Sequence, residues 1–131
     1  MVLSTRYGLA GIGALALLAS AHKLRELGAA PHPAAVYLLG VAPNFAAALA
    51  ITFVLLSIWS DQKRSADYAA VRLAFFGAVA ISCAGLLAWE LFQTTSSKLV
   101  FDSHDIAATL VGGAASWVLF GILTARPQSP D

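Results

Sequence analysis

The sequence predicts an all-α fold, an antiparallel bundle of four transmembrane helices. Of its 131 residues 59% are hydrophobic and only 11% are charged, and the mean hydropathy is +0.76. A soluble domain is about half apolar and about a quarter charged, and a chain this short has too small an interior to bury such an excess. The apolar residues also fall into four long runs, which short charged segments separate. Together these observations predict a single integral membrane domain over 1–131.

The composition also excludes several other classes of protein. A single cysteine, Cys83, excludes an internal disulfide framework and a cysteine-based zinc site. The formal net charge of +1 gives no basic footprint for nucleic acid. The partner that the composition predicts is therefore the lipid bilayer.

Four stretches are long and apolar enough to cross the hydrocarbon layer, which needs about 20 mostly apolar residues. The connections between them are short, so consecutive helices are expected to pack antiparallel. The predicted spans are 7–21, 34–59, 69–92 and 106–125, followed by a polar tail over 126–131.

The first span is the shortest and permits two interpretations. The segment 19–21, Ala-Ser-Ala, has the small residues of a signal-peptidase site, so a cleaved signal peptide is one of them. We expect a retained helix instead. Gly8, Gly11 and Gly13 would then let another helix approach closely.

The second span contains Pro43, which disrupts a helix interior but is favoured in a first turn. The span is therefore either one kinked helix from Ala34, which we favour, or a true span that starts near Pro43. Small residues recur at every fourth position of the second and third spans, where they either form packing stripes or reflect an alanine-rich chain. These residues are Ala42, Ala46, Ala50, Ala80, Ala84 and Ala88.

Basic residues between the spans predict the orientation, because cytoplasmic segments carry more Lys and Arg. Five on one side against three on the other place both termini in the cytoplasm, in a bacterial inner membrane. The five are Arg6, Lys63, Arg64, Arg72 and Arg126, and the three are Lys23, Arg25 and Lys98.

Polar side chains gather where the third span ends and the fourth begins, which this orientation places at the outer face. An ionisable residue costs about 2.5–3.5 kcal/mol at the centre of a span and less near its ends, so it indicates function. Hydration would also explain Glu90, and N-capping would also explain Asp105. Asn44 either hydrogen-bonds to the backbone groups that Pro43 leaves unpaired or acts as a hydrogen-bond donor in a ligand pocket. The candidate ligand-binding residues are Glu90, Gln93, Asp102, Asp105, Thr109 and Asn44.

One face of the fourth span begins acidic and then turns small and polar. We expect it to lie against the third span, opposite Glu90, with Gly112 permitting close approach. The face consists of Asp105, Thr109, Gly112 and Ser116.

His104 lies near two aspartates, but a lone loop histidine is usually solvated. We therefore predict no metal site and no cofactor, and we assign no catalytic residue.

Three segments of the C-terminal third carry a spaced signature: Glu90-Leu91-Phe92-Gln93, then Phe101-Asp102, then 105–112 (DIAATLVG). Their order resembles the pattern of the VanZ-like membrane proteins, which reads E-x-x-Q, then R-x-F-D in a short loop, then D-x-x-A-N-x-x-G. The resemblance implies an envelope-facing membrane protein with four spans, connected with resistance to teicoplanin-type glycopeptides.

The chain departs from that pattern at three places. Thr109 replaces the usual asparagine, so a hydroxyl stands where the family has an amide. No arginine precedes Phe101, and Lys98 is the nearest cation. The second span has Pro43-Asn44-Phe45 in place of a D-K-x-x-H-F start, so no histidine role carries over.

Two functions follow from this reasoning. The first is recognition of an envelope component or glycopeptide, such as a lipid-linked ligand, at the outer polar site. The alternative is an accessory or assembly subunit of a larger respiratory or photosynthetic membrane complex. An enzyme acting on lipid-linked substrates is less supported, because the sequence has no nucleophile elbow, phosphate loop or metalloprotease motif.

Overall fold

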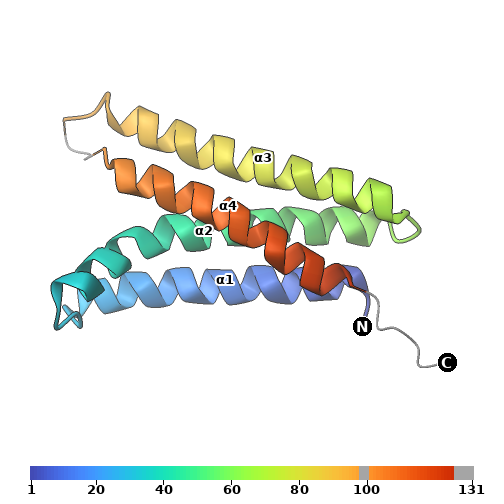
Figure 1. The fold of residues 1–131 in the computed structure, drawn as a ribbon, viewed down its shortest axis with the longest axis horizontal. Helices are drawn as coiled ribbons and strands as arrows, with labels where there is room; N and C mark the ends of the chain where they lie inside the picture. The colour runs from blue at the N-terminus through green and yellow to red at the C-terminus, as the bar shows by residue number, and fades with distance from the viewer. Residues whose placement is uncertain (98–100, 126–131) are drawn as a thin grey trace.

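The computed structural model describes residues 1–97 and 101–125, and it confirms the all-α, four-helix prediction (Figure 1). No strand occurs among these residues. The predicted polar tail 126–131 lies outside them, as does Lys98. The helices are α1 (Leu3–Glu26), α2 (Pro33–Gln62), α3 (Tyr68–Gln93) and α4 (Ser103–Thr124).

All four helices are long and apolar enough to cross a membrane, which indicates a multi-pass membrane protein. The shortest, α4, has 22 residues and spans about 33 Å at 1.5 Å per residue, slightly more than the hydrocarbon thickness of about 30 Å. Each presents large apolar side chains outward, such as Leu73, which is 74% exposed, and Ile122, which is 67% exposed. In water such surfaces would associate, whereas in a bilayer they face lipid.

Helix α2 occupies the centre of the bundle and contacts each of the other three, while α1 and α3 make no direct backbone contact. Helices that are consecutive in the chain run antiparallel (Figure 1). We call the end with the α1–α2 and α3–α4 connections the distal end. The end where α1 begins and α4 finishes is the terminal end.

Pro43 lies inside α2, which settles the alternative left open by the sequence in favour of one continuous helix. The helix begins with Pro33 in its first turn, where the missing N–H costs nothing. Pro43 leaves the carbonyl of Leu39 without its usual helical donor, and a proline inside a helix produces a kink. The first part of α2 runs at an angle to the rest (Figure 1).

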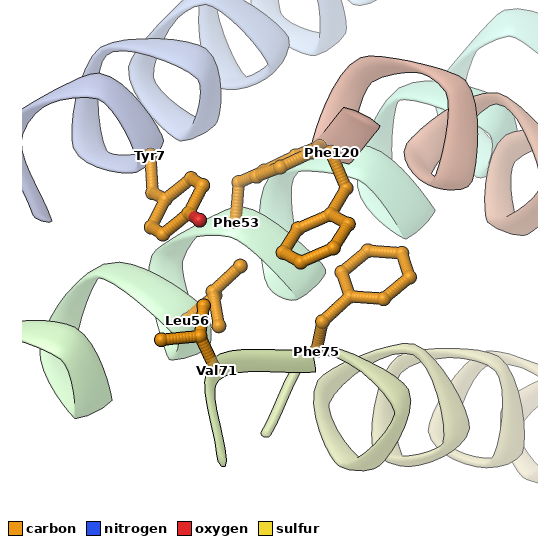
Figure 2. Close-up of a cluster of buried hydrophobic side chains, with 6 residues drawn as sticks. All are labelled: Tyr7, Phe53, Leu56, Val71, Phe75 and Phe120. Carbon is orange, nitrogen blue, oxygen red and sulfur yellow. The ribbon is translucent and has the colours of Figure 1, made fainter. Parts of the chain in front are cut away.

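The apolar core lies toward the terminal end and is built largely from aromatic rings (Figure 2). Phe75 of α3 and Phe120 of α4 stack with ring centroids 4.3 Å apart. The Tyr7 ring of α1 lies 6.1 Å from that of Phe120, and its hydroxyl pairs with Thr124 Oγ1 at 2.8 Å. The cluster comprises Tyr7, Phe53, Leu56, Val71, Phe75 and Phe120.

Polar bonds connect the helices at this end and midway along the bundle. Arg6 Nη1 donates to the carbonyl of Leu123 at 3.0 Å, and so places a positive charge at the C-terminus of α4, where the helix dipole favours a cation. Ser82 Oγ donates to the carbonyl of Ala48 at 3.0 Å and links α3 to α2.

Small residues permit close packing on α1 and α2, but not along the predicted stripe of α3. A Cβ built on Gly11 would lie 2.9 Å from Val54 Cγ2, so this glycine allows α1 to approach α2, as does Gly8 beside Ser57. The prediction is wrong for Gly13, which has open space around it. On α2, Ala46 and Ala50 are buried, whereas the α3 stripe is exposed and does not pack inside the bundle. That stripe is Ala80, Ala84 and Ala88.

Candidate functional site

Three polar side chains from three helices meet near the distal end. Asn44 Nδ2 of α2 donates to Glu90 Oε1 of α3 at 3.3 Å. The Asn44 side chain also lies close enough to the Asp105 carboxyl, in the first turn of α4, to act on it electrostatically. One amide is therefore shared between the neighbourhoods of two carboxyl groups, and we call Asn44, Glu90 and Asp105 the distal triad.

The local sequence explains how the triad is assembled. Asn44 directly follows Pro43, so it lies where the interrupted hydrogen-bond ladder loosens α2. Glu90 is three residues before the end of α3 and Asp105 is two residues past the start of α4, so the short connection between them places both carboxyls at a similar depth. The triad thus lies inside the apolar helices and not in a loop.

Glu90 is the most unusual member, because its side chain is only 2% exposed. Its Oε2 atom has no hydrogen-bond partner in the described part of the chain, and Oε1 accepts only from Asn44. Burying a polar group without a partner costs free energy, and a charged group costs more. The hydration that the sequence offered as an explanation for Glu90 is therefore wrong.

The charges around Asp105 are mixed. Asp102 and His104 flank it on α4, and Arg25 at the end of α1 attracts it electrostatically. The described residues contain two ion pairs, and neither involves the triad. The two pairs are Lys23–Glu26 and Asp61–Arg64, both exposed.

The capping residue of α4 is Asp102, so N-capping, one of the two interpretations of Asp105, does not apply to it. Asp102 Oδ1 accepts from the backbone N–H of His104 at 2.8 Å. Asp105 lies one turn further in, so its carboxyl is free to face Asn44. This assigns a structural role to Asp102 and leaves Asp105 in the triad.

Thr109 and Gln93 lie close to the triad in sequence but do not bond to it. Thr109 is fully buried, and its hydroxyl donates to the carbonyl of Asp105 on its own helix at 3.0 Å. Gln93 is partly buried in the last turn of α3, and among the described residues its side chain forms no hydrogen bond.

The polar face of α4 is internal, but it packs against α2 at Gly112 and not against α3 as expected. A Cβ on Gly112 would lie 2.7 Å from the carbonyl oxygen of Phe45 and 2.8 Å from Ala48 Cβ. The neighbouring Gly113 is the residue that approaches α3, near Cys83. The physical reason is that α2 is central, so α4 presents its smallest face to α2.

Two further residues lie beside the triad: Tyr37, which was missed as a site candidate, and His104, which was considered only as a metal ligand. Tyr37 OH pairs with His104 Nδ1 at 3.1 Å, and the two rings meet edge to face with centroids 5.3 Å apart. Tyr37 lies seven residues before Asn44, a spacing that puts both on one face of a helix, and this signal was present in the sequence. The pair stands at one edge of an apolar hollow of about 370 Å³ between α2 and α4.

This hollow is lined by residues adjacent in sequence to Asn44 and Asp105, including Phe45, Ala107 and Ala108. The described part of the chain has no group of three or more His, Cys, Asp or Glu side chains suited to a metal ion. The arrangement offers hydrogen-bond acceptors and negative charge beside an apolar surface. Comparison with known proteins finds no matching family, no matching curated protein and no matching solved structure.

Proposed function

We propose that the chain is a VanZ-like protein of the bacterial cytoplasmic membrane whose distal triad recognises an envelope component. The observation that carries the proposal is the buried Glu90 carboxyl with an unpartnered oxygen inside a membrane helix. Membrane proteins retain such groups where they act, because they weaken the fold. On this proposal the triad binds a ligand. The connection of the VanZ-like family with glycopeptide resistance favours a ligand from the cell envelope.

The chemistry of the site defines the ligand's recognised group. The triad presents two carboxyls and one amide, so the group that binds must donate hydrogen bonds or carry positive charge. The hollow between α2 and α4 adds an apolar surface at the same end of the bundle. A peptide-like or amino-bearing envelope component has both features.

The proposed orientation puts the triad at the outer face, with both termini in the cytoplasm. The charge bias supports it, because Lys63 and Arg64 lie in the α2–α3 connection at the terminal end and Arg6 begins α1 there.

The alternative, an accessory subunit of a larger membrane complex, is favoured by one observation on α3. Its exposed face carries small residues, with nothing within 4 Å of a Cβ built on Gly77 or Gly85, and such faces accept a neighbouring helix in lipid. The exposed small residues are Gly77, Ala80, Ala84, Gly85 and Ala88.

Affinity purification in mild detergent, from the organism that encodes the chain, separates the two functions. The recognition function predicts that the protein elutes as a monomer or a dimer. A stoichiometric complex with other membrane proteins would contradict it and support the accessory role. A variant with leucine at Ala84 is the matched control, because a complex held by the α3 face would then dissociate.

A further inference from the structure

We propose that the distal triad binds one small monovalent cation, Na⁺ or K⁺, between Glu90 and Asp105. This inference rests on the proposed function, because it assigns the chemistry of the same site. It starts from the burial of Glu90, which is 2% exposed and has an oxygen without a protein partner. A buried oxygen without a partner can be satisfied by a small ion that coordinates it.

The charges facing the site favour a cation. At the start of α4, Asp105 is accompanied by Asp102 and His104. The positive charge that α1 contributes near Asp105 is that of Arg25. The α2 contribution is neutral, namely Asn44 and the Tyr37 hydroxyl that pairs with His104. No described ion pair neutralises Glu90. One added positive charge would compensate the carboxyl that the protein leaves uncompensated.

The available ligand atoms are oxygens, which hard cations prefer. The unpartnered Glu90 Oε2 is the first, and the Asp105 carboxyl near the same Asn44 amide is the second. Because Asn44 donates through Nδ2, its Oδ1 remains an acceptor. Pro43 also leaves the carbonyl of Leu39 without a helical donor one turn before Asn44.

The same features disfavour divalent cations. Mg²⁺ dehydrates reluctantly and keeps several waters, which a site this buried does not accommodate. Ca²⁺ brings two positive charges, whereas Arg25 already offsets part of the negative charge at Asp105. A monovalent ion is satisfied by fewer charged ligands, and a ligand ammonium group would occupy the same position by the same chemistry.

The test is the thermal unfolding midpoint of the full chain in mild detergent, with NaCl, KCl or N-methylglucamine chloride at equal ionic strength. An ion that binds only the folded state stabilises it in proportion to the logarithm of its concentration above Kd. We expect the midpoint to rise with NaCl or KCl, relative to the bulky organic cation. A midpoint that is the same in all three salts would overturn the proposal without any variant.

Two variants assign the effect to the triad. Glu90→Gln and Asp105→Asn are each expected to abolish the difference between salts, while Glu26→Gln, an exposed carboxyl, is expected to keep it. A salt difference that persists in both triad variants would place the ion elsewhere and refute the proposal.

If the ion effect is absent but Glu90→Gln still loses its cellular function, only the cation assignment fails. If purification yields a stable complex but the ion effect is present, only the recognition function fails.

Discussion

Gly112→Leu is expected to destabilise the bundle by about 3 kcal/mol, at the upper end of the range for overpacked interiors. Even a Cβ at this position would lie 2.7 Å from the backbone carbonyl oxygen of Phe45, which cannot rotate away as a side chain would. The α2–α4 contact would have to open, and the Asn44–Asp105 contact lies one to two turns away along the same pair of helices. The free energy of unfolding in mild detergent measures the effect.

Gly121→Leu is the matched control, because Gly121 lies on the same helix with nothing within 4 Å of an added Cβ. Val111→Leu, at a residue that is 58% exposed, is expected to change stability by less than about 0.5 kcal/mol. If the variants at 112, 121 and 111 were equally stable, the close α2–α4 contact would not exist.

Glu90→Gln is expected to preserve the fold and to abolish function. Glutamine has nearly the shape of glutamate and keeps an oxygen that accepts from Asn44, so the bond at 3.3 Å survives. It loses the negative charge, which the proposed ligand requires. The measurement pairs unfolding in detergent with glycopeptide tolerance in a strain that depends on the protein.

The control is Glu26→Gln, since Glu26 forms an exposed i,i+3 pair with Lys23, and such pairs contribute little. It is expected to leave both tolerance and stability unchanged. If the Glu90→Gln protein kept both its stability and full glycopeptide tolerance, the Glu90 carboxyl would have no function. The proposal that the triad recognises a ligand would then be refuted.

Hydropathy predicted the four helices because membrane crossing depends on apolar length alone. It did not predict where they end. The first helix continues from the apolar run to Glu26, since Lys23 and Glu26 are good helix formers that pair along its last turn. Hydropathy marks the part of a helix that lies in lipid, and the backbone continues beyond it.

The sequence could not tell which small residues pack inside the bundle. Ala46 and Ala84 belong to stripes with the same spacing, yet the first is buried and the second is exposed. In lipid both a partner-facing and a lipid-facing surface are apolar, so the usual contrast between core and surface disappears. The same ambiguity assigned Gly112 to the wrong neighbour.

The residues of the triad could be predicted from the sequence, because few polar residues lie in the apolar helices. All three members, Asn44, Glu90 and Asp105, were among the candidates. The sequence did not show which aspartate caps α4 and which belongs to the site. Asp102 and Asp105 both lie where an N-cap is expected, and the residue at which α4 begins decides between them. Arg25 was missed as a neighbour because α1 approaches α4 through the tertiary fold.

Cysteine labelling of intact cells tests whether the four-span bundle presents the distal triad at the outer face of the membrane. In a Cys83→Ala background, single cysteines are placed at Ser103, which begins α4 at the distal end, and at Ser65, in the α2–α3 connection. Both positions are exposed, so access depends on the side of the membrane. We expect a membrane-impermeant thiol reagent to modify the cysteine at 103 and not the one at 65, whereas modification at 65 alone would invert the orientation.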